Sequence, residues 1–112
     1  VLAATRGVSA ALMHFQAAVR LAPDLMEARY CLADALVESG RLAEAIAEFA
    51  AAVRIAPDNA DVRSSFGRAL LSAGRVDEAV VQFEEALRLR PDHGEARAGL
   101  TAAYARLRPS VR

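Results

Sequence analysis

The sequence predicts an all-α fold in which antiparallel helix hairpins stack as an α-solenoid. The main observation is a fixed period: Pro23, Pro57 and Pro91 lie 34 residues apart twice over (57 − 23 = 34 and 91 − 57 = 34), and an aspartate follows each of them. A period of this length is typical of repeat proteins, in which each unit contacts only its neighbours. Function in such a fold is expected on an extended surface rather than in an enclosed catalytic pocket.

The second observation is that the period extends well beyond the prolines. Residues 40–49 (GRLAEAIAEF) align with residues 74–83 (GRVDEAVVQF) at the same offset (74 − 40 = 34). Near the N-terminus, however, Arg6-Gly7 reverses the Gly-Arg order of the two later turns. We expect a distorted turn at Arg6-Gly7.

The third observation is helical spacing of the apolar residues. In the second helix of each repeat, a phenylalanine lies four residues after one alanine and three before another, which places all three on one helix face. These phenylalanines are Phe15, Phe49 and Phe83. The first helices carry large apolar pairs four positions apart, namely Leu32 with Leu36, Phe66 with Leu70, and Leu100 with Tyr104. Each repeat is therefore predicted to be a two-helix hairpin.

At this length we expect one domain over residues 1–112. In chain order its predicted parts are a partial repeat at 1–25 that is mainly a second helix, full repeats at 26–59 and 60–93, and at 94–112 the first helix of a further repeat or a capping helix. Residues 1–5 supply only the last turn of a first helix in this scheme.

Turn residues mark the ends of the predicted helices. Gly40 and Gly74 follow the first helices and suit the left-handed conformation that ends a helix. The prolines end the second helices, because proline lacks an amide hydrogen and restricts the residue before it. Three pairs have the spacing of a capping box: Asp24 with Glu27, Asp58 with Asp61, and Asp92 with Glu95. This spacing explains the acidic residues without a ligand.

The chain resembles the tetratricopeptide-repeat family, whose 34-residue pattern is W-x2-L-G-x2-Y, then A-x3-F, then P. One unit reads Arg29-x2-Leu32-Ala33-x2-Leu36, Ala45-x3-Phe49 and Pro57, and the next reads Arg63-x2-Phe66-Gly67-x2-Leu70, Ala79-x3-Phe83 and Pro91. Arginine replaces the tryptophan of the pattern at Arg29, Arg63 and Arg97, where its stem can pack while its charge stays hydrated. We expect Gly67 and Ala79 to allow close helix approach, with Phe83 filling the space between successive hairpins.

The resemblance implies a right-handed superhelix whose concave surface is lined by the first helices and receives a peptide or a partner helix. By that analogy the candidate partner-binding residues are Tyr30, Asp34, Glu38, Ser64, Ser65, Arg68, Ser72 and Arg106. Tyr30 and Arg68 are the foremost candidates, because tyrosine and arginine most often anchor interfaces. Asp61 and Glu95, by contrast, are interpreted as helix-start residues.

Composition argues against most enzymatic chemistry. All 14 basic residues are arginine, so the chain has no lysine for a Schiff base or a P-loop. Cys31 is the only cysteine, and His14 and His93 lie far apart in the repeat register, which leaves no metal-ligand set. We therefore expect no enzyme, no cofactor and no metal site.

The net charge is zero, because 14 acidic residues balance the arginines, so nothing draws in nucleic acid or an anionic membrane. A protein or peptide partner is expected instead. The lysine- and asparagine-based clamp with which some members of the family bind acidic chaperone tails is disfavoured, since Asn59 is the only asparagine. Two alternatives remain: a recruiting or regulatory module of a larger enzyme, such as a glycosyltransferase, or of a secretion or assembly component, and, less favoured, a helical-repeat RNA binder.

The two ends of the chain suggest self-association. Leu100, Tyr104 and Leu107 share one face of a helix that has no predicted partner, and solenoid ends normally need polar caps. The chain also begins without methionine and within the repeat register, which favours a piece of a longer protein in which a signal or anchor could lie upstream. With no apolar run of about 20 residues and no signal-like start, a soluble, cytoplasmic module is the default expectation.

Overall fold

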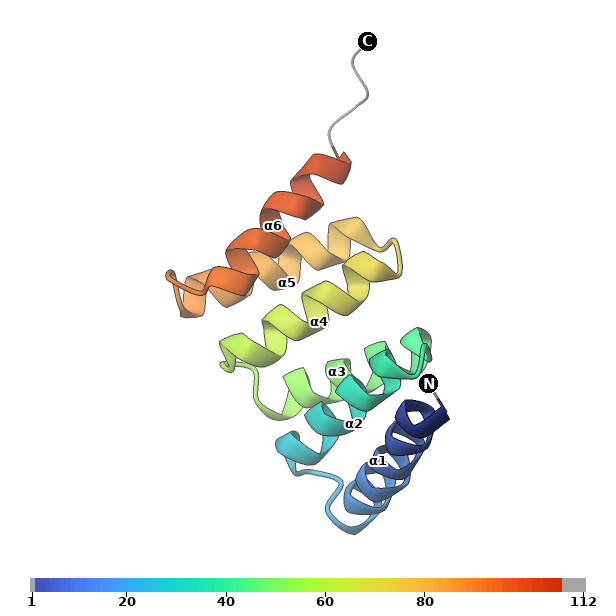
Figure 1. The fold of residues 1–112 in the computed structure, drawn as a ribbon. Coiled ribbons are helices and arrows are strands. Elements are labelled where there is room, and N and C mark those ends of the chain that lie inside the picture. The colour runs from blue at the N-terminus through green and yellow to red at the C-terminus, as the bar shows by residue number, and fades with distance from the viewer. Residues whose placement is uncertain (1, 108–112) are drawn as a thin grey trace. The chain divides into compact units, whose positions relative to one another are not determined.

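The computed structural model describes residues 2–107, which form six α-helices joined by short turns and contain no strand (Figure 1). The helices are α1 (Leu2–Leu21), α2 (Met26–Glu38), α3 (Leu42–Ile55), α4 (Ala60–Ser72), α5 (Val76–Leu89) and α6 (Gly94–Leu107). The prediction of an all-α helical-repeat fold is confirmed.

The chain divides into two compact units, with the boundary between Pro57 and Asp58. In the N-terminal unit, α2 packs against both α1 and α3. In the C-terminal unit, α4 packs against α5 and α6, and α5 also packs against α6. Figure 1 shows α2 in front of α3, and α4 and α6 in front of α5, so the first helices form one face of each unit. Each unit therefore contains one complete hairpin and one additional helix.

The helix α1 differs from the prediction, because it runs without interruption through Arg6 and Gly7. The expected turn at this point, and with it a separate helix end before it, is not formed. Among the described residues only Gly40 and Gly74 have a positive φ, whereas Gly7 stays in the helix. The reversed Gly-Arg order therefore does not produce the left-handed step that ends the later first helices.

The turns at Gly40 and Gly74 have the predicted left-handed conformation, with φ of 81° and 80°. The Gly40 amide donates to Val37, and the Arg41 amide donates to Leu36 at 2.9 Å. This pair of hydrogen bonds is the Schellman arrangement, which satisfies carbonyl groups that a helix end leaves open. The turn that contains Gly74 repeats the pattern one period later. Each first helix is thereby connected to its second helix by the same turn.

The predicted aspartate caps are wrong. The Leu25 amide donates to Ala22 at 3.1 Å, which makes Pro23 and Asp24 the central residues of a turn, a position where proline is favoured. The N-cap of each first helix is consequently one residue later than expected. These N-cap residues are Leu25, which makes no side-chain cap hydrogen bond, Asn59, which accepts from Val62, and His93, which accepts from Ala96.

Arginine in the tryptophan column links the two helices of a hairpin. Arg29 on α2 pairs with Glu48 on α3 at 3.0 Å, and Arg63 on α4 donates to Gln82 on α5 at 3.0 Å. The two acceptors are themselves one period apart (82 − 48 = 34). The Arg29 side chain keeps 24% of its surface exposed, so its charge remains partly hydrated, as predicted.

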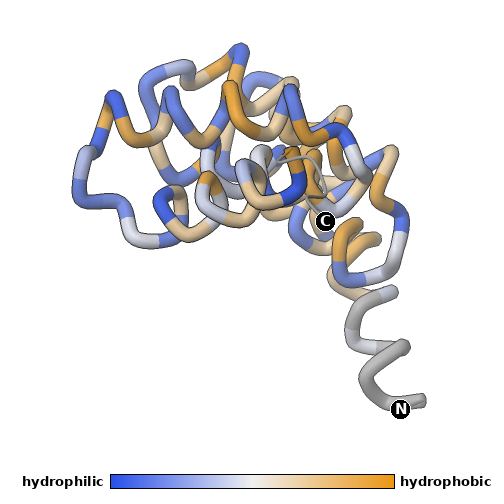
Figure 2. The backbone as a smooth tube through the Cα atoms, turned by 90° about the horizontal axis from the view of Figure 1, so that it is seen from above, coloured by the Kyte–Doolittle hydropathy of each residue, from blue (hydrophilic) through white to orange (hydrophobic). Residues whose placement is uncertain are grey.

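Phe83 is the centre of the C-terminal unit and is fully buried. A Cβ atom added at Gly67 on α4 would lie 2.8 Å from the Phe83 ring, and one added at Gly99 on α6 would also overlap the ring. Phe83 of α5 therefore fills the space between α4 and the following α6, as predicted, but two glycines make room for it rather than one. Figure 2 shows that hydrophobic and hydrophilic stretches alternate along the helices, as expected for helices that bury one face.

Candidate peptide-binding face

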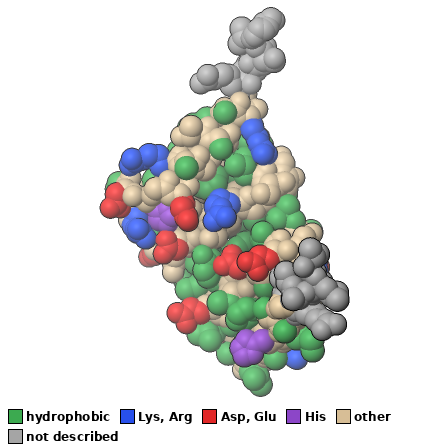
Figure 3. All heavy atoms as spheres, in the orientation of Figure 1, with side chains coloured by type: hydrophobic (Ala, Val, Ile, Leu, Met, Phe, Trp, Pro, Cys, Tyr) green, Lys and Arg blue, Asp and Glu red, His purple; other side chains and the backbone are tan. Residues whose placement is uncertain are grey.

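The first-helix face of the C-terminal unit contains a shallow hollow between α4 and α6. It is lined by Arg68 from α4 and by Glu95, Ala98 and Gly99 from α6, and has a volume of about 340 Å³. Small residues on α6 keep the hollow open, and the Gly99 backbone rests on the buried Phe83 ring. The hollow thus combines a small apolar floor with one positive and one negative side chain. Figure 3 shows arginine and acidic side chains interspersed with hydrophobic ones on this face.

Arg68 is exposed and makes no hydrogen bond or ion pair with any other residue that the structure describes. Its guanidinium has five donor groups and a permanent charge, so it is available for a carboxylate or a carbonyl group of a partner. Partner binding by Arg68, which the sequence interpretation favoured, stays a prediction.

Arg106 is also exposed, but it is engaged within the unit. Its Nη1 donates to the carbonyl oxygen of Leu71 at 2.8 Å, which joins the last turn of α6 to the last turn of α4. A cation at the C-terminal end of a helix is favourable, since the open carbonyl groups there carry partial negative charge. Arg106 therefore positions the two helices that form the hollow, and Ser72 lies exposed beside this contact.

Ser64 and Ser65 were expected on the binding face, but both are buried, with 0% and 9% of their surface exposed. Ser64 shares a helix face with Ala60 and Gly67, which points to the interior. The Ser64 hydroxyl makes no hydrogen bond within the described part of the chain. Neither serine is available to a partner in this structure.

In the N-terminal unit the candidates Tyr30, Asp34 and Glu38 form a stripe along α2 at intervals of four residues. Tyr30 is half-buried, with its ring edge-on to Phe49 at a centroid distance of 6.0 Å. Asp34 and Glu38 are exposed, so this stripe is acidic. Burial raises the pKa of the neighbouring Cys31 thiol, and the nearby carboxylate of Asp34 raises it further. The thiol therefore stays protonated and is a poor nucleophile.

The comparisons with known proteins agree with this architecture. A family model described as tetratricopeptide repeat matches residues 24–92, which is more than half of the chain. The chain belongs to the tetratricopeptide-repeat family. No curated protein matches the sequence.

Solved structures with the same repeat fold are numerous. A mutant O-GlcNAc transferase of Thermobaculum terrenum is 30% identical with a TM-score of 0.79, and YrrB, described as a TPR protein with an unusual peptide-binding site, is 28% identical with a TM-score of 0.80. These two matches cover 86% and 89% of this chain, but only 18% of the transferase and 52% of YrrB. The first TPR domain of Spaghetti (RPAP3), bound to an HSP90 peptide, shows the fold alone, with a TM-score of 0.87 at 20% identity over 92% of this chain and 82% of that one.

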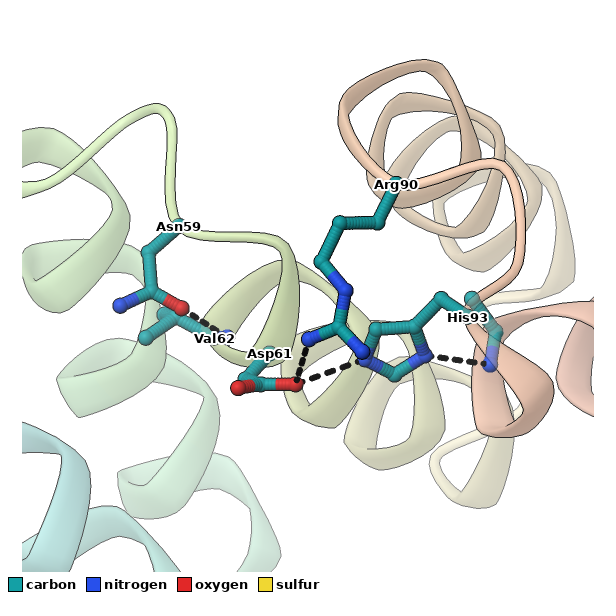
Figure 4. Close-up of polar contacts among 6 residues, drawn as sticks. Asn59, Asp61, Val62, Arg90 and His93 are labelled. Carbon is teal, nitrogen blue, oxygen red and sulfur yellow. Dashed lines mark hydrogen bonds and ion pairs between the residues drawn. The ribbon is translucent and has the colours of Figure 1, made fainter.

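Besides the hollow, a polar cluster connects the starts of α4 and α6 in this tetratricopeptide-repeat chain (Figure 4). The His93 ring is 4% exposed, and its Nε2 lies 2.7 Å from the Asp61 carboxylate, which Arg90 also contacts at 3.3 Å. On the other side of the ring, Nδ1 accepts from the Ala96 amide at 3.1 Å. The ring hydrogen therefore lies on Nε2 and is donated to Asp61.

The sequence interpretation favoured a helix-start role for Asp61 and did not include His93 in any site. The signal that could have found the cluster is the repeat register, because His93 stands one period after the N-cap Asn59 (93 − 59 = 34). Within residues 2–107, no three His, Cys, Asp or Glu side chains gather closely enough to hold a metal ion. None of the described helices has the length and apolar character needed to cross a membrane.

Proposed function

We propose that this chain is a protein-interaction scaffold that binds a peptide or a partner helix on its first-helix face, with Arg68 as the anchor. The observation that carries the proposal is the hollow beside Arg68, where a guanidinium without an intramolecular partner stands over the small residues Ala98 and Gly99. Tetratricopeptide repeats in general are non-catalytic interaction modules, and two of the similar structures are described as binding peptides or as bound to one.

The chemistry of the hollow defines the partner segment. An acidic side chain or a chain-terminal carboxylate would pair with Arg68 in a charge-assisted hydrogen bond, and a small apolar side chain would cover Ala98. Glu95 at the rim disfavours a second acidic group at that end. We therefore expect the hollow to select a segment with a single, localised carboxylate.

A random peptide library selected on the wild-type chain tests this proposal. We expect peptides enriched in one acidic residue next to a small apolar residue, and we expect Arg68→Ala to weaken their binding about tenfold, equivalent to about 1.4 kcal/mol. Arg54→Ala is the matched control, because Arg54 is an exposed arginine at the end of α3 in the other unit. Equal affinity of the two variants, or a selection without any enriched peptide, would refute the assignment of the hollow.

A second candidate function is recruitment within a larger enzyme. The O-GlcNAc transferase that is 30% identical to this chain favours it, because the match covers only 18% of that protein. In this case the same face would present a substrate or a regulator to a catalytic domain elsewhere. The genomic sequence on both sides of these 112 residues tests this candidate, and an open reading frame without a catalytic domain would exclude it.

A further inference from the structure

The last helix, α6, has an uncovered face in a position where the earlier first helices are covered. Tyr104 stands one period after Leu70 and two after Leu36 (104 − 70 = 34 and 70 − 36 = 34). Leu36 and Leu70 are 3% and 1% exposed, whereas Tyr104 is 46% exposed. The helices α2 and α4 have α3 and α5 packed against them, but no described helix follows α6. The position that a second helix of the repeat occupies on α2 and α4 is uncovered on α6 among the described residues.

The N-terminal helix of the chain, α1, also has a partly uncovered face. Phe15 stands in the column of Phe49 and Phe83, which are 1% and 0% exposed, yet Phe15 is only half-buried. The two signature alanines on its face, Ala11 and Ala18, are also half-buried, whereas their counterparts on α3 and α5 are fully buried. Thus α1 has the spacing of a second helix of the repeat, and the described residues cover its signature face only in part.

The arginine column gives a second, polar indication. Arg97 on α6 donates from Nη2 to the carbonyl oxygen of Pro91, just as Arg29 donates to Pro23, but its Nη1 has no acceptor within the described residues. In the complete hairpins the acceptors for this arginine are Glu48 and Gln82. The same column on α1 is occupied by His14, which is exposed and, when neutral, has a nitrogen that accepts a hydrogen bond (48 − 14 = 34).

We propose that α1 of a second copy of this chain packs on α6 of the first, and that the two form an intermolecular hairpin equivalent to α2–α3 and α4–α5. In this hairpin Phe15 of one copy packs over Thr101 of the other, whose repeat counterparts are the buried Ala33 and Gly67. His14 of one copy accepts from Arg97 of the other. Because the two surfaces differ, the contact is head-to-tail, and each copy retains a free α1 or α6 for further growth.

A second copy is favoured over an unrelated partner, because α1 carries the same alanine and phenylalanine spacing as the helices that pack on α2 and α4. The Ala-x3-Phe-x2-Ala spacing of Ala11, Phe15 and Ala18 is that of α3 and α5. Thr101 is somewhat larger than Ala33 or Gly67, so the intermolecular hairpin is expected to be looser than the internal ones. Its Oγ1 already bonds to the Arg97 carbonyl at 3.0 Å, which leaves the methyl group for the phenylalanine ring.

Sedimentation velocity of the 112-residue chain over a wide concentration range tests the proposal. We expect a mass that rises with concentration above the 11.9 kDa of the monomer. Thr101→Glu should abolish the association, because it places a charge under Phe15. Thr101→Ala should strengthen it, because alanine restores the small residue of the other repeats. Ala102→Glu is the matched control, since Ala102 is exposed on the adjacent hollow-facing side of α6, and it should leave the association unchanged.

Charge variants of His14 on α1 and Arg97 on α6 test whether the helix that packs on α6 is α1 of a second copy. We expect His14→Glu to tighten the association about threefold to tenfold, because it supplies the acceptor found at Glu48, and Arg97→Glu to weaken it. The double variant His14→Arg with Arg97→Glu should regain association that His14→Arg alone has lost. Circular dichroism checks that each variant is folded. A chain that remains monomeric throughout, or a double variant that is no better than His14→Arg, would overturn the proposal.

Discussion

Single residues decide how closely the helices of this chain approach one another. The two glycines around Phe83, Gly67 on α4 and Gly99 on α6, lie where no side chain fits without displacing the buried ring. Phe83 is 0% exposed, and because protein interiors are closely packed, moving its ring would require neighbouring side chains to shift. The identity of these two positions is therefore fixed by packing rather than by helix propensity, which alone would favour alanine.

Gly99→Ala separates these two effects. Helix propensity alone would stabilise the chain by about 1 kcal/mol, whereas overlap with the Phe83 ring would cost about 1 to 3 kcal/mol. We expect net destabilisation, measured as a lower midpoint of urea unfolding. Gly7→Ala is the control, because Gly7 is also helical but has open space around its Cβ position, and it should raise the midpoint. A stabilising Gly99→Ala would contradict the close packing of α6 on Phe83.

At the scale of the single helix, the first helices differ in their N-cap residue, although the N-cap has the same repeat position in each. Asn59 and His93 accept a backbone hydrogen bond at the start of α4 and α6, whereas Leu25 provides none at the start of α2. His93 additionally holds Asp61 and thereby connects the starts of two first helices. Each cap of this kind contributes about 1 kcal/mol.

His93→Ala should remove both the cap of α6 and the contact with Asp61, and we expect a loss of about 1 to 3 kcal/mol in the free energy of unfolding. His93→Asn should retain the cap and lose only the contact, so its loss should be smaller. Leu25→Asn is the complementary variant, since it adds a cap at an exposed position and should stabilise the chain by about 1 kcal/mol. Chemical denaturation of the three variants measures these differences, and an order in which His93→Asn is the least stable would refute this account.

The elements also show where sequence reasoning succeeds. Periodicity and glycine chemistry predicted the hairpins and the left-handed turns at Gly40 and Gly74, because both depend on residues close in the chain. The aspartate caps were wrong because proline at the second position of a turn moves the helix start by one residue. The burial of Ser64 and the role of Gly99 depend on packing between helices, which spacing within one helix does not encode.

At the scale of the whole molecule, the repeat architecture predicts that stability is local. In a solenoid each unit is stabilised by itself and its neighbours, so a defect in one hairpin should affect that hairpin most. The chain provides a matched pair for this question, because Ala45 and Ala79 occupy the same repeat position in the two units and are both 0% exposed.

Ala45→Leu and Ala79→Leu should each cost about 1 to 3 kcal/mol through overpacking. We expect hydrogen exchange to accelerate mainly in α2 and α3 for Ala45→Leu and mainly in α4, α5 and α6 for Ala79→Leu, by about tenfold for each 1.4 kcal/mol. Mass spectrometry of peptic fragments resolves the two regions. Equal acceleration along the whole chain in both variants would mean that the six helices open in one cooperative step, and the description of the stability as a sum of local repeat contributions would then be wrong.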